Sequence, residues 1–397
     1  MKIMLLTDVP PCKNYTAGIV LNILCGFLLE AGHDVCCFAV QSEAIENSAE
    51  IPEDKKSLIP FASARMPKEN WGHASPHFLS SYIRNNLAAI LELPPIARKA
   101  VAFAKSNDVD LIWSVVQGQS TIKLTERIAK SSGLEYVVQV WDPPNWWLRD
   151  NRFDEKTTKY VLNAFGRIIR NSKCCIAASW VMAETYTERY GCPKSIPVIL
   201  GFDPERVQPK REKNPHRFTI VFSGQMYASN ELQSLIYALD ILGWQFEGKE
   251  IVLRCYGRAF QLFFSHSARV EVCGWLPYDD LVTELAEADL LYCPYWFDPV
   301  FEEEASLSFP SKLTTYFKTG VPVLFHGPDY ASPRKFIAET GSAYICGTLY
   351  PPGIVEVLQY IMTDTNRHAV GEQGFYTFSQ RLTLENMRSN FFEALGI

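Results

Sequence analysis

Short apolar runs alternate with amphipathic segments along the whole chain, and this rhythm restricts the fold more than any other feature. In the first half the runs lie at 3–7, 35–40, 111–116, 136–141, 174–179 and 196–200. Runs that are continuously rich in Val, Ile and Leu are typical of parallel strands that helices cover on both faces. The first half is therefore predicted to form a doubly wound α/β domain.

The alternation stops at a polar, proline-bearing segment, 203–216, and then begins again, which predicts a linker followed by a second domain. A chain of 397 residues is also too long for a single core, because cores rarely grow beyond about 250 residues. We expect Rossmann-like domains at 1–205 and 206–375, and a final helix at 376–397 that either stays with the second domain or returns to the first. Two such sheets facing across a cleft would bind ligands there, outside the carboxyl ends of their strands.

Composition excludes several classes of protein. The formal charge is -6 and the pI is about 5.7, whereas a nucleic-acid-binding protein normally presents a basic face. The 11 cysteines lie mostly inside apolar runs, which is typical of buried thiols in a reducing compartment. They form no CxxC pair or Cys/His cluster, so no metal site is expected.

The beginning of the chain reads as a strand. Lys2 is followed by a short apolar run, 3–6, and then by Asp8, which is not the pattern of a signal peptide. No apolar stretch approaches the roughly 20 residues that cross a bilayer. We expect a cytoplasmic protein, either free or peripheral at the inner face of the membrane.

The stretch 308–324 carries the most chemical information. Ser308, Pro310 and Ser311 precede good helix formers, and Gly320 ends them, so the sequence predicts a short helix that runs into a strand. The free amides at a helix start bind anions. Lys312 lies in the first turn, where a cation is unfavourable for the helix itself, so we favour a role in diphosphate binding over a solvated lysine.

This stretch resembles the donor-binding segment of GT-B glycosyltransferases, particularly the family 4-like group (glycosyl transferases group 1), which reads approximately S-x-P-x-K-L-x-x-Y-x-x-x-G-x-P-V. Weaker matches follow the order seen in that family; they are GHDV at 32–35, ILGFDP at 199–204, FSG at 222–224, CYGR at 255–258 and VCGWLP at 272–277. The resemblance implies an N-terminal acceptor domain and a C-terminal donor domain. It also implies transfer of a hexose-type sugar (EC 2.4) from a nucleoside diphosphate to a glycan, lipid-linked or small-molecule acceptor, without cofactor or metal.

Candidate site residues follow from these matches. Lys312 and Arg258 are the cations expected to neutralise the leaving diphosphate. The predicted donor contacts are Gly18, Gly224, Gly257, Trp275, Leu276, Ser308, Ser311 and Thr315. Gly18 would let the backbone approach the donor closely, although a plain helix start explains it equally well.

The chain departs from the family at the glutamate pair, whose positions are occupied by Leu307 and Thr315. Glu302 to Glu304 lie upstream, where a run of three acids favours a solvated loop. Retention of the anomeric configuration is therefore open. An inverting reaction would need a carboxylate base, for which Asp142, at the end of a predicted strand, is the candidate, with loop capping as an equal alternative. Gln119 and Trp146 are the predicted acceptor contacts.

The stretch from Arg65 to Arg84 mixes cations and aromatic residues, and contact with a membrane-borne acceptor is one interpretation of it. Two other functions stay open: a non-hydrolysing sugar-nucleotide epimerase, and a degenerate subunit that binds a sugar nucleotide without turnover. The sequence does not indicate an oligomeric state.

Overall fold

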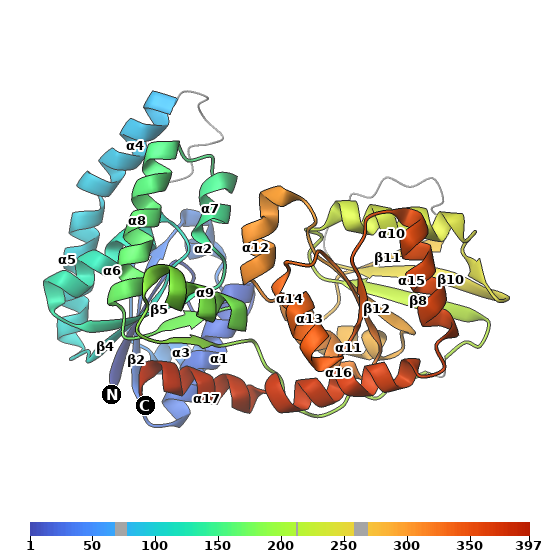
Figure 1. Cartoon of the computed structure of the whole chain (residues 1–397). Coiled ribbons are helices and arrows are strands. Elements are labelled where there is room, and N and C mark those ends of the chain that lie inside the picture. The colour runs from blue at the N-terminus through green and yellow to red at the C-terminus, as the bar shows by residue number, and fades with distance from the viewer. Residues whose placement is uncertain (68–77, 212, 258–268) are drawn as a thin grey trace. The chain divides into compact units, whose positions relative to one another are not determined.

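The computed structural model describes residues 1–67, 78–211, 213–257 and 269–397. Contacts divide the chain into two compact units, Met1–Val198 with Arg388–Ile397 and Ile199–Met387 (Figure 1). Each unit contains a parallel sheet with helices, so the predicted pair of Rossmann-like α/β folds is present.

In the part of the N-terminal unit that the structure describes, seven parallel strands form one sheet in the order β3-β2-β1-β4-β5-β6-β7. The strands are β1 (Lys2–Thr7), β2 (Asp34–Gln41), β3 (Phe61–Arg65), β4 (Leu111–Val115), β5 (Glu135–Val140), β6 (Cys175–Ala177) and β7 (Ser195–Pro197). The helices are α1 (Thr16–Glu30), α2 (Glu43–Ser48), α3 (Glu53–Leu58), α4 (Phe78–Leu91), α5 (Leu93–Ser106), α6 (Gln119–Ser132), α7 (Pro144–Asp150), α8 (Glu155–Asn171) and α9 (Trp180–Tyr190). The strand order reverses between β1 and β4, and sheets of this kind bind ligands beyond the carboxyl ends of such strands.

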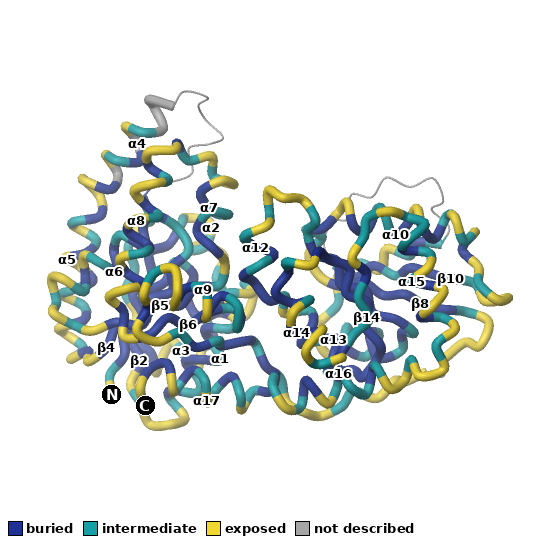
Figure 2. Tube along the Cα trace, viewed as in Figure 1, coloured by how far each residue is buried: buried dark blue, intermediate teal, exposed yellow. Residues whose placement is uncertain are grey.

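The core of this unit lies on the central strands, which are dark blue in Figure 2. Residues 3–6 of β1 have no exposed surface, and Leu5 pairs with Cys37 of β2, which is also fully buried. Because side chains on both faces of the sheet are covered, the strands need continuous apolar runs, and the sequence supplies them.

The last helix, α17 (Leu384–Leu395), adds side chains to the N-terminal unit. The buried ring of Phe391 lies 4.8 Å from that of Trp113, and Asn390 Nδ2 donates to the carbonyl of Pro197 at 3.0 Å. Residues from 388 onward therefore complete a core whose other members come from the first 198 residues.

The C-terminal unit has a second sheet in the order β11-β10-β8-β12-β13-β14, with β9 antiparallel to β10. Its strands are β8 (Arg217–Ser223), β9 (Gln245–Phe246), β10 (Lys249–Tyr256), β11 (Val270–Gly274), β12 (Leu290–Pro294), β13 (Val323–His326) and β14 (Tyr344–Cys346). The helices are α10 (Ser229–Ile241), α11 (Tyr278–Ala286), the 3-10 turn η2 (Pro299–Phe301), α12 (Glu302–Leu307), α13 (Ser311–Thr319), α14 (Ser332–Thr340), α15 (Pro351–Thr363) and α16 (Arg367–Arg381). The reversal of strand order falls between β8 and β12.

The segment predicted as a linker is attached to the C-terminal unit. Phe202 forms a bridge with Thr383, and the Arg206 guanidinium pairs with both carboxylate oxygens of Glu372, the Nη1 to Oε2 distance being 2.9 Å. Its guanidinium also lies 5.2 Å from the ring of Phe375. Among the described residues, no helix is both long enough and apolar enough to cross a bilayer.

Candidate functional site

The candidate site is built around the start of α13, at the carboxyl edge of the second sheet. Pro310 precedes the helix, no side chain caps its first amides, and its first turn contains no acid. Gly320 ends the helix in the left-handed conformation, with φ of 70°. The Leu313 amide donates to the Pro310 carbonyl at 3.0 Å, and among the described residues no side chain caps the amides before it. The start of the helix is also the positive end of its dipole, an arrangement that favours an anion.

The Lys312 side chain carries the charge in this region. Its Nζ lies 4.3 Å from the ring centroid of Tyr227 and 4.4 Å from that of Phe222. The residue as a whole is half-buried, but Nζ itself is sealed from solvent and has no hydrogen-bond partner among the described residues. The ammonium therefore rests between two aromatic faces, which attract a cation but cannot accept a strong hydrogen bond.

Removal from water makes this ammonium easier to deprotonate. Burial lowers the pKa of Lys312 from 10.5 to about 8, with a smaller opposing effect from Cys293. A buried cation without a counter-ion is costly, and perturbed groups of this kind gather at functional sites. An anion placed beside Nζ would remove that cost.

The end of β8 and the loop after it pack against α13 and the Lys312 side chain. The backbone amide of Ser223 donates to the Tyr316 hydroxyl at 2.8 Å, which fixes the second turn of α13 against the end of the strand. Gly224 follows with φ of 98°, and a Cβ there would lie 3.8 Å from Lys312 Cε. Gly224 is exposed, so the missing side chain leaves the backbone next to Lys312 open to a ligand.

Three other predicted donor contacts, Gly257, Trp275 and Leu276, lie at or just after the ends of the next strands, β10 and β11. The amide of Gly257 donates to the carbonyl of Gly274 at 2.8 Å, where both glycines have positive φ. The following Trp275 is 59% exposed, and Leu276 is half-buried. An exposed indole beside this edge can stack on a planar group. Arg258 lies outside the described residues.

Three further predicted donor residues lie on or next to α13. Ser311 is exposed in the first turn, whereas Ser308 is buried and its carbonyl accepts from Ser332 Oγ at 2.9 Å. Thr315 is half-buried and hydrogen bonds to Tyr278. The Ser308 hydrogen bond therefore fixes the segment that leads into α13, and the exposed Ser311 is the first residue of the helix.

The interpretation of Glu302 to Glu304 as a solvated loop is wrong. These residues form the first turn of α12, and Glu304 is buried while Glu302 is exposed. Leu307, at the first position of the family's glutamate pair, lies one helical turn after Glu304 and is buried with it. Three successive acids indicated a solvated segment, but the turn of the helix directs the Glu304 side chain toward the protein interior.

In the N-terminal unit, Gly18 is enclosed by its own loop. A Cβ at this position would lie 2.2 Å from Cys12 Sγ and 2.7 Å from the carbonyl oxygen of Pro10. The amide of Cys12 also donates to the carbonyl of Gly18 at 3.1 Å. The glycine thus lets the β1–α1 loop pack closely onto α1.

The predicted acceptor residues differ in accessibility. Gln119 is buried, and its side chain accepts from Lys123 Nζ at 2.6 Å, so the protein already uses its amide. Asp142 is exposed just before α7, and Trp146 is half-buried within that helix. Of these three, Asp142 and Trp146 are the ones that a ligand could reach.

Sequence reasoning did not select Asp8, which follows β1 at the reversal of the first sheet. Its Oδ1 is sealed from solvent and has no hydrogen-bond partner in the described structure. Burial raises the pKa of this carboxyl to about 6, against a smaller opposing effect of nearby backbone amides. A sequence signal existed, because a carboxylate directly after a central strand lies where parallel sheets bind ligands.

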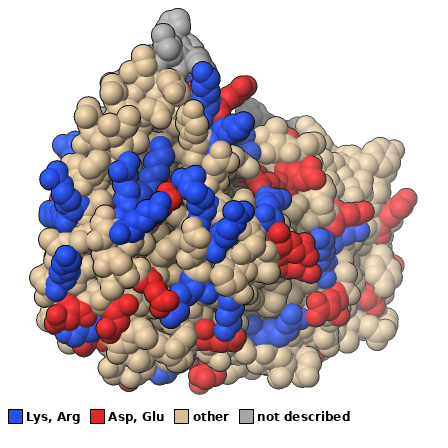
Figure 3. Space-filling model, turned by 60° about the vertical axis from the view of Figure 1, so that its left-hand side comes forward, with Lys and Arg blue, Asp and Glu red and all other residues tan. Residues whose placement is uncertain are grey.

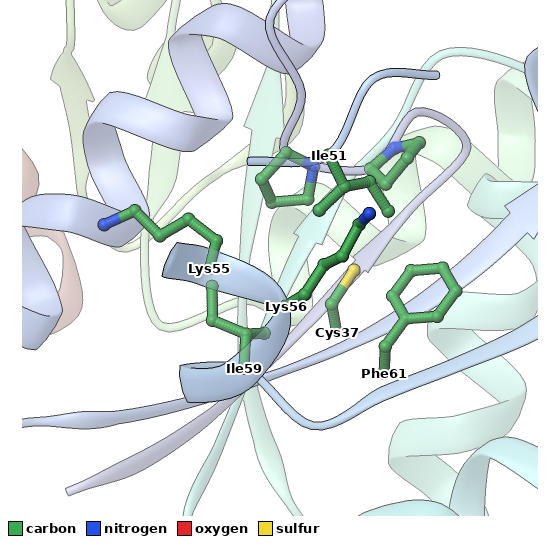
Figure 4. Close-up of a pocket in the computed structure, with 8 residues that line it drawn as sticks. Cys37, Ile51, Lys55, Lys56, Ile59 and Phe61 are labelled. Atoms are coloured by element: carbon green, nitrogen blue, oxygen red, sulfur yellow. The ribbon is translucent and has the colours of Figure 1, made fainter. Parts of the chain in front are cut away.

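A mostly apolar pocket of about 230 Å³ lies close to the same loop (Figure 4). Pro10, Pro11, Cys37, Ile51, Ile59 and Phe61 form its walls together with Lys55 and Lys56 of α3. In Figure 4 the Lys56 side chain extends toward Ile51, whereas that of Lys55 points away. All residues that line this pocket belong to the N-terminal unit, whereas the α13 site is built from residues of the C-terminal unit.

Comparison with known proteins bears on the fold. No protein-family model matches the chain, and no curated protein sequence matches it. Among solved structures, sucrose-phosphate synthase from Thermosynechococcus elongatus superposes with a TM-score of 0.69 at 13% identity, covering 100% of this chain and 98% of that one. HepE from Anabaena, solved in complex with UDP, gives 0.66 at 15% identity, with 100% of both chains covered.

A trehalose 6-phosphate synthase from Burkholderia multivorans gives a TM-score of 0.67 at 11% identity, covering 100% of this chain and 96% of that one. The chain has the GT-B fold. At such low identity the likeness establishes the fold, and the activity must be argued from the site.

Proposed function

We propose that this GT-B protein is a glycosyltransferase that binds a nucleoside-diphosphate sugar at the start of α13. The observation that carries the proposal is the buried ammonium of Lys312, which has no hydrogen-bond partner in the described part of the chain, at the start of a helix that no described side chain caps. HepE, which shares the fold, was solved with UDP and with UDP-glucose, and this supports a nucleotide-sugar ligand. The membership of the family 4-like group, suggested by residues 308–323, is part of this proposal.

The chemistry follows from where charge develops. The acceptor hydroxyl forms a bond to the anomeric carbon, the bond from that carbon to the diphosphate oxygen breaks, and the nucleoside diphosphate leaves with additional negative charge. The α13 amides and Lys312 would stabilise this charge. Charge-assisted hydrogen bonds to phosphate are stronger than the cation–π contacts that the ammonium makes with Phe222 and Tyr227, so the side chain can exchange one for the other.

We propose that these groups replace a divalent metal ion. A fixed ammonium and a helix start provide the same kind of stabilisation as a metal does for a leaving diphosphate. The expected result is full transfer activity in the presence of EDTA. A strict requirement for Mg²⁺ or Mn²⁺ would refute this part of the proposal.

On the acceptor side, inversion would require a carboxylate that takes the proton of the attacking hydroxyl. The N-terminal unit offers Asp142, which is exposed, and Asp8, which is half-buried at the strand reversal with its Oδ1 sealed from solvent. If the reaction inverts, exchange of the base for asparagine is expected to abolish transfer while leaving nucleotide binding intact. A glycan, a lipid-linked sugar and a small molecule stay as the proposed acceptor classes.

The decisive test compares two lysines of α13. Lys312→Ala is expected to weaken the binding of nucleoside diphosphate by roughly 10- to 100-fold and that of the nucleoside by much less, because one charge-assisted contact is lost. Lys318→Ala, in the last turn of the same helix, is the matched control, since that ammonium lies 5.7 Å from the Phe202 ring and far from the helix start. Calorimetric titration measures both. Equal losses for nucleoside and nucleoside diphosphate would contradict the phosphate role.

Turnover separates the remaining possibilities. Release of nucleoside diphosphate from a panel of sugar nucleotides is expected, and it should depend on an acceptor. Binding without release under every acceptor would instead indicate a sugar-nucleotide-binding subunit. A changed sugar on an intact nucleotide would indicate an epimerase.

A further inference from the structure

Helix α4 presents large apolar side chains to the outside. Ile83, Leu87, Ile90 and Leu91 are 47%, 48%, 63% and 65% exposed. At 100° per residue these four positions fall within a stripe about 100° wide, which is the usual width of the face that a helix buries. The exposed stripe is thus of the kind that normally faces a core.

The opposite side of the helix is the one that packs on the protein. Asn85 and Ala89 are buried, and α4 packs against α5 and α8. Asn86 Nδ2 donates to Thr157 Oγ1 of α8 at 3.3 Å. Asn85 and the small Ala89 therefore face inward, while the large apolar side chains of Ile83, Leu87, Ile90 and Leu91 face outward, whereas a surface helix in a soluble domain normally buries its large apolar side chains.

The neighbouring helix α8 supplies positive charge beside this stripe. Lys156 Nζ lies 5.7 Å from the ring of Tyr82 on α4, and Lys156, Lys159 and Tyr160 form one exposed face of α8. Figure 3, which brings the left-hand side of Figure 1 forward, shows many lysine and arginine side chains on the face turned toward the viewer. The α4 segment itself, 78–91, contains no acid.

The two units also differ in total charge. The N-terminal unit contains 23 Lys and Arg against 21 Asp and Glu, whereas the C-terminal unit contains 15 against 23. The acidity of the whole chain, at a formal charge of -6, therefore comes from the C-terminal unit. The exposed apolar stripe lies on the unit that is net positive.

We propose that the α4–α8 face, defined by Ile83, Leu87, Ile90, Leu91, Lys156 and Lys159, docks the protein on a bilayer that carries anionic headgroups. The apolar stripe enters the boundary between headgroups and acyl chains, and the two ammonium groups pair with phosphates beside it. Tyr160, which is 52% exposed, can lie at the headgroup level, as aromatic side chains do at membrane interfaces. This inference does not depend on the proposed function, because it uses no residue of the α13 site.

A bilayer fits this face better than a second copy of the chain does. A symmetric dimer through this face would pack the same lysine-bearing patch of both copies together. That like-charge contact is unfavourable, whereas an anionic surface complements it. The apolar stripe and the two lysines then both favour an anionic bilayer.

The test is sedimentation of the full chain with vesicles. Binding is expected to vesicles of equimolar phosphatidylcholine and phosphatidylglycerol, to be much weaker to phosphatidylcholine alone, and to fall with added salt. The double variant Leu87→Ser, Ile90→Ser and the double variant Lys156→Gln, Lys159→Gln should each weaken binding by roughly 10- to 30-fold. The folded state should tolerate both, since all four side chains are exposed.

Matched controls come from the C-terminal unit. Ile241→Ser removes an apolar side chain that is 58% exposed at the end of α10, and Lys249→Gln removes an exposed cation; neither should change vesicle binding. The proposal is overturned if the wild-type chain does not sediment with anionic vesicles, or if the controls weaken binding as much as the α4 and α8 variants do. It is also overturned if analytical ultracentrifugation shows a dimer that the α4 double variant dissociates, because the stripe would then serve self-association.

Discussion

If a nucleoside diphosphate binds beside Lys312, as proposed, its affinity should depend on pH. The pKa of Lys312 is about 8, and an adjacent phosphate would raise that value. Below pH 8 the ammonium is already charged, whereas above it binding must take up a proton. The affinity for nucleoside diphosphate should therefore fall by up to about tenfold per pH unit above pH 8.

Calorimetric titration in buffers of different ionisation enthalpy measures this proton uptake directly. Lys312→Met should abolish both the uptake and the pH dependence, and Lys318→Ala should keep both. An identical pH profile in the Lys312→Met protein would show that another group titrates.

Asp8 predicts a second effect at the residue scale, this time on stability. Its folded pKa of about 6 exceeds the ordinary value of 3.8, so the folded state favours the protonated carboxyl. The stability that this preference contributes is present below pH 3.8 and is lost as pH rises through 6. Asp8→Asn should therefore raise the free energy of unfolding of the N-terminal unit by up to about 3 kcal/mol at pH 8, and by less at pH 5.

Urea unfolding at the two pH values tests this expectation. Asp34→Asn is the control, since that carboxyl is exposed at the start of the neighbouring strand. A loss of stability in Asp8→Asn would show that the carboxylate has a stabilising partner in solution.

At the scale of elements, α1 and the β1–α1 loop depend on one glycine. Gly18→Ala should destabilise the N-terminal unit by about 1–3 kcal/mol, because its Cβ would meet the Pro10 carbonyl and Cys12 Sγ. Gly26→Ala, on the same helix, meets only the flexible end of Lys55 at 3.6 Å and should be neutral or gain up to about 1 kcal/mol from helix propensity. Thermal unfolding compares the two; equal effects would mean that the loop relaxes without cost.

The sequence predicted helices and strands better than any other feature of the structure. The continuous apolar runs anticipated the strands because a covered parallel sheet buries both faces of each strand, as in β1 and β2. The start and end of α13 were readable from Pro310 and Gly320, whose backbone preferences are local.

Features that depend on packing could not be predicted in this way. Glu304 was expected in a solvated loop, and its burial follows from the register of α12. The aromatic surroundings of Lys312 come from Phe222 and Tyr227, some 90 residues earlier in the chain. Similarly, the apolar stripe of α4 was invisible in the sequence, because an amphipathic pattern does not say which face is turned outward.

At the scale of the whole molecule, the N-terminal unit needs the end of the chain. Phe391 and Leu395 are buried in it, although about 190 residues of the C-terminal unit separate them from Val198. The core of the first unit is therefore completed only after the second unit has been synthesised. Its stability should depend on α17, while the α13 site, which lies in the other unit, should not.

Phe391→Ala is expected to destabilise the N-terminal unit by about 3–5 kcal/mol, because it empties a space against the Trp113 ring. In calorimetric unfolding the transition of that unit should move to lower temperature, and nucleoside diphosphate binding measured well below this transition should be unchanged. Tyr376→Ala is the control, since that aromatic side chain is 59% exposed on α16. If Phe391→Ala weakened nucleotide binding as strongly as Lys312→Ala does, the two units would have to be energetically coupled through α17, and the assignment of the donor site to the C-terminal unit alone would fail.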